Sequence, residues 1–199
     1  MNSAGNYKYP IKKIVMKQIL LGILIAVVMT TLFWGTSPTT TDVIYWTSGY
    51  KLTWNDFEGA PNYKHEYKDI SAITFSGIVD YRGCEEGKIV YKIKAYFEKK
   101  NSWVKAIGQN DHTLEHEQVH FDITELYARK LRNALSGQVF TCGEEHTFET
   151  FVNDFLKGWQ KMQEDYDGET GYSHKHQEQD EWIEKVRAEM KELEAFKSE

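Results

Sequence analysis

The first 41 positions of this 199-residue chain contain no acidic residue. They contain four lysines, and an apolar run over residues 19–34 follows, broken only by Gly22 and a pair of threonines. The lysines are Lys8, Lys12, Lys13 and Lys17. A positive flank ahead of an apolar segment is typical of a secretory signal or a signal anchor. We therefore expect a cytoplasmic N-terminus (1–17), a signal peptide or signal anchor (18–35), a polar linker (36–42) and an exported domain (43–199).

Two further absences bear on whether this segment is cleaved. No small-x-small cleavage site follows the apolar run, and no cysteine suited to lipid attachment lies near its end. The run is also shorter than the ~20 residues of a typical spanning helix. The missing cleavage site favours a retained anchor over a cleaved signal. In either case the domain is expected outside the cytoplasm, in the periplasm or cell envelope.

Positive charge is scarce in the rest of the chain. Without the four N-terminal lysines, 20 basic residues stand against 30 acidic ones, a net charge of −10. A strongly negative domain argues against nucleic acid as a partner. The expected partner is a peptide or protein substrate, with the membrane as a second partner if the N-terminal segment is retained.

Cysteine is rare as well, with Cys84 and Cys142 as the only two. Each lies beside a glycine in a turn-like segment, and export would permit a disulfide between them. Two unrelated free thiols are the alternative, because a sequence does not show proximity. A structural zinc site built on these two cysteines lacks further ligands at a suitable spacing.

The periodicity of apolar residues changes along the exported part. Alternating residues predict two strands at 70–81 and 88–97 that form an antiparallel hairpin. Helical spacing predicts three later helices, at 111–135, 147–166 and 177–197. A glycine-containing break is expected between the last two, at 167–173. Strands first and helices later indicate an α+β fold, a small antiparallel sheet followed by about three helices.

The first expected helix contains the pattern H-E-x-x-H at residues 116–120. His116 and His120 lie one turn apart on the same face of a helix. Two imidazoles so placed can share a tetrahedral Zn²⁺, with Glu117 as general base towards a metal-bound water. An α+β domain with this pattern on its first helix would be zincin-like. Two buried, hydrogen-bonded core histidines are the simpler alternative.

A helical projection separates this pair from a polar stripe. The stripe contains Glu115, Gln118, Asp122, Glu125 and Arg129. Glu125 and Arg129 are correctly ordered for an i, i+4 ion pair. We expect the stripe to face solvent, which makes Glu125 a poor metal ligand. The histidines point to the protein interior, where their ring nitrogens need partners.

Several motifs together resemble the bacterial family DUF922, whose members are predicted to be secreted zinc-dependent proteases. They are LTWNDF at 52–57, Trp103, HEQVHFDI at 116–123, YDGET at 166–170, Gln179 and Trp182. This resemblance spans most of the exported part. It implies a zinc site formed by His116 and His120, with Glu117 as the catalytic base.

The chain departs from the family pattern after YDGET. Many members have His-Gly where this chain has Tyr172-Ser173. The third metal ligand is therefore open between Asp167, Tyr172 and His174. Asp167 has a further alternative, because an aspartate there could also cap a turn. His112, one turn before His116, would be badly placed on a straight helix to complete a tetrahedral site.

The function expected from these residues is a zinc metallopeptidase that hydrolyses peptide bonds with metal-activated water. Tyr166 or Tyr172 could stabilise the oxyanion, and Asp122 could orient a ligand histidine or could simply be an exposed charge. Two alternatives remain. One is a different zinc hydrolase, such as an amidase acting on cell-envelope material. The other is a non-catalytic metal-binding envelope domain.

Overall fold

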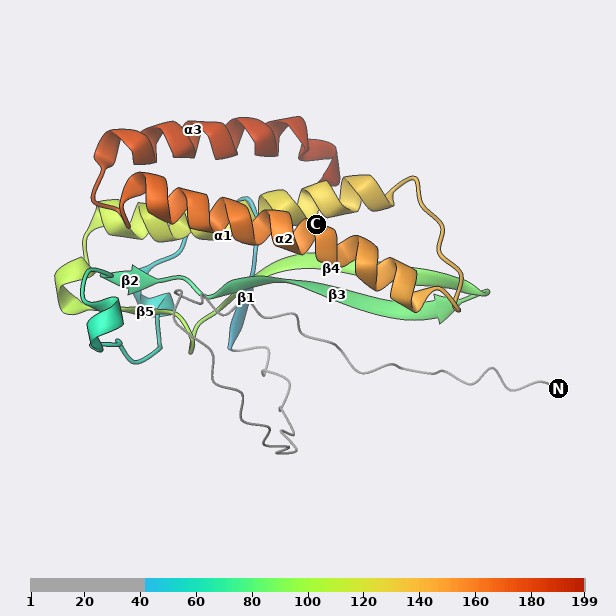
Figure 1. The fold of residues 1–199 in the computed structure, drawn as a ribbon, viewed down its shortest axis with the longest axis horizontal. Coiled ribbons are helices and arrows are strands. Elements are labelled where there is room, and N and C mark those ends of the chain that lie inside the picture. Colours follow the sequence, from blue (N-terminus) through green and yellow to red (C-terminus); the bar gives the residue numbers. More distant parts are fainter. Residues whose placement is uncertain (1–41, 199) are drawn as a thin grey trace.

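The computed structural model describes residues 42–198 (Figure 1). The expected cytoplasmic segment, the anchor and nearly all of the linker lie outside the described residues. Within residues 42–198, no helix combines the length and the hydropathy that crossing a membrane requires. The fold is α+β, as the sequence predicts, with a small antiparallel sheet followed by three helices.

The main sheet has the strand order β1-β4-β3 and is antiparallel throughout. Its strands are β1 (Val43–Tyr45), β3 (Ser76–Glu85) and β4 (Lys88–Glu98). The hairpin between β3 and β4 closes at the pair Glu85–Lys88. Glu86 and Gly87 between them both have positive φ, at 49° and 77°, as a tight two-residue hairpin turn requires. The predicted hairpin is therefore confirmed.

The predicted first strand of that hairpin is in fact two strands. The chain leaves β2 (Ala72–Ile73), passes through Thr74 and Phe75, and only then enters β3. The short strand pairs with β5 (Trp103–Val104) in a separate two-stranded sheet. This break matters for function, because it brings Thr74 against the helix that carries the two histidines.

That helix is α1 (Asp111–Leu135), and it packs on β4 and β3 (Figure 1). Asn110 caps it, since its side chain accepts a hydrogen bond from the Thr113 amide at 2.9 Å. Two further helices, α2 (Glu145–Thr170) and α3 (His176–Glu192), pack against α1 and against each other. A short 3₁₀ turn (Glu194–Phe196) follows α3 and also contacts α1.

The polar stripe of α1 is largely buried, contrary to the expectation that it faces solvent. Glu125 is 0% exposed and Arg129 is 1% exposed. Arg129 donates to Glu125 at 3.0 Å, so the predicted ion pair forms, and it also donates to the carbonyl of Met190 in α3 at 2.6 Å. A projection of one helix cannot show that α3, far along the chain, covers this face.

The second helix is longer than the periodicity predicts. A break between the last two helices is present, but it starts later than the expected 167–173, because α2 continues through Gly168 to Thr170. It ends at Gly171, whose φ of 59° is the left-handed conformation that favours glycine at a helix end. Asp167 therefore lies on a helix and not in a loop, which fixes where its side chain points.

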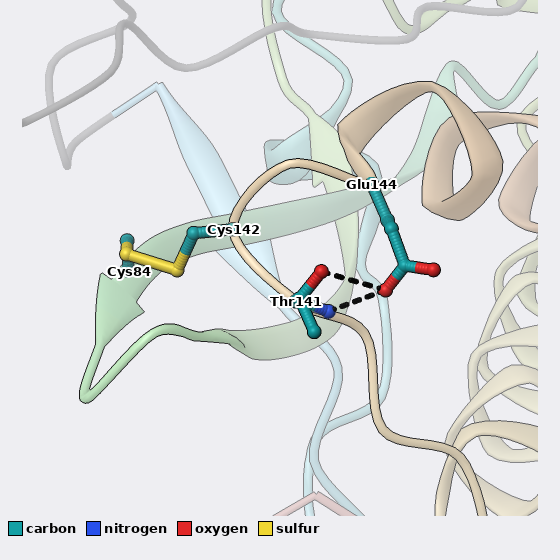
Figure 2. Close-up of a disulfide and its surroundings, with 4 residues drawn as sticks. All are labelled: Cys84, Thr141, Cys142 and Glu144. Atoms are coloured by element: carbon teal, nitrogen blue, oxygen red, sulfur yellow. Dashed lines mark hydrogen bonds between the residues drawn. A yellow bond between two sulfur atoms is a disulfide. The ribbon is translucent and has the colours of Figure 1, made fainter.

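A disulfide joins the hairpin to the connection between α1 and α2. Cys84 in β3 and Cys142 are bonded, with their Cα atoms 5.8 Å apart (Figure 2). Thr141 next to it donates from its amide and its hydroxyl to Glu144 at 2.7 and 2.9 Å. The loop closed by this bond is 58 residues long, and the entropic account gives about 4 kcal/mol of stabilisation for such a length.

Candidate metal centre

Three side chains from two helices converge at one end of α1. His116 Nε2 and His120 Nε2 lie 3.2 Å apart, and Asp167 Oδ1 of α2 lies 3.2 Å from the first and 2.9 Å from the second. Within the described part of the chain, this is the one cluster of three or more potential ligands that is close enough to hold a metal ion.

The dimensions of this triangle fit a tetrahedral ion. With zinc–ligand bonds of about 2.0–2.1 Å, neighbouring donor atoms of a tetrahedral site are about 3.3 Å apart. The three observed separations are within a few tenths of an ångström of that value. Two imidazole nitrogens and one carboxylate oxygen are also a common donor set for zinc. The residues therefore fit the metal that the motif predicts.

Gln163 fixes how the His120 ring is used. The Gln163 side-chain nitrogen donates to the carbonyl of His120 at 2.9 Å, so its oxygen faces the ring. His120 Nδ1 lies 2.6 Å from that oxygen, which can only accept. Nδ1 therefore carries a proton, and in the neutral ring Nε2 presents a lone pair towards His116 and Asp167. This is the tautomer that a metal ligand needs.

The His116 ring is held mainly by packing. Tyr166 stacks on it with ring centroids 4.5 Å apart, and the same tyrosine meets the His120 ring edge-on at 4.9 Å. His116 Nδ1 and the side-chain oxygen of Gln179 are both buried without a hydrogen bond of ordinary geometry among residues 42–198. The Gln179 side chain is still near enough to raise the pKa of His116, but burial lowers that pKa by more.

Burial lowers the pKa of both rings, whereas the neighbouring Asp167 raises it. Burial dominates at His116 and lowers its pKa to about 4, so this ring is neutral. At His120 burial also favours the neutral ring, but Asp167 and Glu117 outweigh it and raise its pKa to about 9. Burial would raise the pKa of Asp167, whereas the two histidines hold it well below its usual range. The aspartate is therefore an anion that can accept either a proton or a metal.

Glu117 completes the cluster on the side of β2. Its carboxyl group is buried and burial raises its pKa to about 7. Its Oε2 atom has no hydrogen-bond partner among the described residues. Thr74 lies against this residue, and the Thr74 hydroxyl donates to the backbone oxygen of Glu117 at 3.2 Å. An unpartnered buried carboxylate oxygen usually indicates a functional role or an absent ligand.

A small cavity of about 20 Å³ lies between these groups. His116, Glu117, His120 and Asp167 all line it, together with residues of β2. Its volume corresponds to about one water molecule. The arrangement thus places one water-sized space next to three potential ligands and one potential base.

The other ligand candidates are placed differently. His174 is exposed and is not part of the cluster. Tyr172 lines the small cavity but is 37% exposed, and both it and Ser173 have left-handed φ values of 55° and 69°. His112 is not part of the cluster; its Nε2 donates to the Ser173 carbonyl at 2.9 Å and its ring stacks on His176.

Two of the roles expected for nearby residues change in the structure. Asp122 accepts hydrogen bonds from Trp46 Nε1 at 2.8 Å and from Gln118 Nε2 at 2.9 Å. It therefore joins the segment around Trp46 to α1, and it makes no such hydrogen bond to either ligand histidine. Tyr166 is buried and its hydroxyl is 3.4 Å from the His116 carbonyl, so it supports the rings from behind.

Sequence reasoning missed Gln163 and Thr74. Gln163 precedes Asp167 by one helical turn, so an uninterrupted α2 would have placed both on one face towards His120. The expected break at 167–173 hid that relation. Thr74 gave no signal, because its position depends on the break between β2 and β3.

The fold and the site define an α+β domain with a candidate metal site of two histidines and one aspartate. The family profile described as "Bacterial protein of unknown function (DUF922)" matches residues 94–176, a segment that contains both histidines and Asp167. The match supports the family assignment that the sequence motifs indicate. No curated protein and no solved structure matches the chain significantly.

Proposed function

We propose that this protein is an extracytoplasmic zinc-dependent peptidase. The observation that carries the proposal is the combination of three converging ligand atoms with a buried, unpartnered Glu117 oxygen around one water-sized cavity. His116, His120 and Asp167 would hold the ion. A structural zinc site is usually closed by four protein ligands, and it would not need the neighbouring carboxylate.

Each residue has a definite task in such a reaction. A bound zinc ion would lower the pKa of a coordinated water and polarise a carbonyl group. Glu117 takes a proton from the attacking water and later gives it to the leaving amine. Gln163 keeps the lone pair of His120 directed at the site. Tyr172 lines the cavity and is partly exposed, and its hydroxyl would donate to the developing oxyanion.

The location outside the cytoplasm rests on two features. The N-terminal segment has the charge and hydropathy pattern of an export signal or anchor. The disulfide between Cys84 and Cys142 is typical of oxidising compartments. The substrate would then be a peptide or protein of the cell envelope, or an amide bond of the cell wall.

A non-catalytic metal-binding domain is the second candidate. The observation that favours it is the depth of the site, since His116 is 3% and His120 is 5% exposed. The cavity beside them has room for a water but not for a peptide. On this alternative the ion would stabilise the junction of α1 and α2 and nothing more.

Replacement of Glu117 by glutamine separates the two candidates. The amide has the shape of the carboxyl group but cannot take a proton. For a peptidase we expect unchanged zinc content and a 10²- to 10⁴-fold loss of kcat, measured with a mixture of unstructured peptides and mass spectrometry. If wild-type protein with one bound zinc per chain cleaves no peptide, the second candidate replaces the first.

A further inference from the structure

A second and larger cavity, of about 200 Å³, adjoins the candidate metal centre. It shares Ile73, Thr74 and His120 with the small cavity, so the two spaces meet at the break between β2 and β3. His120 and Gln163 line its inner end. A group in this cavity would therefore lie next to the ring that the metal is proposed to use.

Three aromatic side chains, Tyr67, Phe75 and Trp103, form part of the wall of this second cavity. Tyr67 and Trp103 meet edge to face with centroids 6.1 Å apart, and Phe75 and Ile73 add further apolar surface. Edge-to-face clusters of this kind accept another aromatic ring readily. A further aromatic ring in this cavity could therefore make edge-to-face contacts with the wall.

Polar groups in the cavity are neutral when His120 binds the metal, because a histidine ligand is a neutral ring. Asn62 is partly exposed and Asn101 is exposed, whereas Ser76 is buried. Among the described residues that line it, none is an aspartate, glutamate, lysine or arginine. Lys105 lies close by but donates to the backbone oxygen of Tyr67 at 2.6 Å. A charged side chain placed here would be desolvated without a counter-charge, which is strongly unfavourable.

The size of the cavity selects among neutral side chains. A cavity of roughly 150 Å³ is known to hold a benzene molecule. The space of about 200 Å³ therefore admits a phenyl or phenol ring. A small side chain such as alanine would leave most of the space unfilled and forgo most of the contacts with Tyr67 and Trp103.

We propose that this cavity, lined by Tyr67, Phe75 and Trp103 and adjoining His120, binds an uncharged aromatic side chain of the peptide substrate next to the bond that is cleaved. This inference rests on the proposed peptidase function and names its substrate class. The enzyme would prefer peptides with phenylalanine or tyrosine at that position and would discriminate against lysine and aspartate there.

Peptides that differ at one position test the preference. Full-length protein in lipid nanodiscs, loaded with zinc, is given quenched fluorescent peptides of alanine and glycine with a central Phe, Lys or Asp. We expect kcat/KM for the Phe peptide to exceed the other two by at least about tenfold, with cleavage beside the Phe. Cleavage of all three at similar rates would overturn the inference and leave the proposed function intact.

Two substitutions at Asn62 locate the effect in the cavity. Asn62→Trp fills the space and should remove most of the preference for Phe. Asn62→Asp adds a negative wall and should raise the rate on the Lys peptide relative to the Phe peptide. Tyr63→Trp is the matched control, because Tyr63 is 73% exposed and does not line the cavity. An unchanged preference in both Asn62 variants would contradict the proposal.

Binding without turnover separates the site from the activity. The Trp103 indole NH signal is followed by NMR in the Glu117→Gln protein while N-acetyl-phenylalanine amide, or the lysine or aspartate analogue, is added. We expect a saturable shift with the phenylalanine compound alone, and its loss in Asn62→Trp. That result without any peptide cleavage would leave the aromatic site standing and reject the peptidase. No shift with any of the three would reject the aromatic site.

Discussion

Two clusters of buried charge are built around α1 and are used differently. The first is His116, His120 and Asp167 near the start of α1, and the second is Glu125, Arg129 and Arg132 farther along it. In the second cluster Glu125 Oε1 accepts from Arg129 at 3.0 Å and from Arg132 at 2.6 Å. Two guanidinium groups converge on one acceptor oxygen there, as in a structural ion-pair network.

The first cluster has the opposite balance. Three atoms that can each present a lone pair point at one another within about 3 Å. Only a proton or a cation between them removes the repulsion of these lone pairs. A buried carboxylate oxygen without a partner among the described residues does not separate the clusters, because Glu117 and Glu125 each have one. The comparison shows that burial and charge alone do not mark a functional site, whereas a surplus of converging acceptors does.

The largest effect should come from breaking the structural cluster. Arg129→Met keeps the length of the side chain but leaves Glu125 buried with only Arg132 as its partner, which we expect to destabilise the fold by about 3–5 kcal/mol. Urea denaturation measures the change. Zinc affinity of the folded protein should stay as in wild type, and a loss of zinc binding would mean that the two clusters are coupled.

The double variant Glu125→Leu/Arg129→Met is the control for that prediction. It removes both the acid and its first partner, so most of the lost stability should return. If the double variant is as unstable as the single one, the destabilisation came from lost packing of Arg129 over the Trp46 ring and not from unpaired charge.

A smaller effect is expected where a neutral residue orients the first cluster. Gln163→Leu removes the acceptor for His120 Nδ1 but keeps an apolar volume of similar size. We expect zinc affinity to fall 10- to 100-fold, because the ring is no longer fixed in one tautomer. Competition with a chromogenic chelator measures it. Gln138→Leu, at an exposed position in the loop after α1, should leave the affinity unchanged.

The smallest effect should come from the helix end that precedes both clusters. Asn110→Ala removes the cap of α1, and we expect a loss of about 1 kcal/mol in the free energy of unfolding. Thermal melting followed by circular dichroism checks this. Zinc affinity should change by less than in Gln163→Leu, and a larger change would show that the start of α1 is strained by the site.

Much of the first cluster could be predicted from the sequence because it is local. H-E-x-x-H on a capped amphipathic helix fixes His116 and His120 without knowledge of the rest of the chain. Asp167 could not be singled out, since Gly168 beside it reads as a helix break. Only the structure shows that α2 continues past Gly168 and carries the aspartate to the histidines.

The second cluster was misjudged for a different physical reason. The helical projection correctly predicted that the histidines point inward. The same projection predicted that Glu125 and Arg129 lie on a solvent-exposed face. That face is covered by α3 and the turn after it, some 60 residues later, where Met190 and Glu194 satisfy Arg129. Periodicity within one segment reports which residues share a face, but not what covers that face.

Zinc titration of three proteins tests the central claim most directly. Wild type, Asp167→Ala and His174→Ala are purified without metal and titrated against a chelator of known affinity. We predict one zinc per chain in wild type, the same affinity in His174→Ala and at least a 100-fold loss in Asp167→Ala, because a three-ligand site becomes a two-ligand site. Absence of zinc binding in wild type, or equal affinity in wild type and Asp167→Ala, would contradict the account.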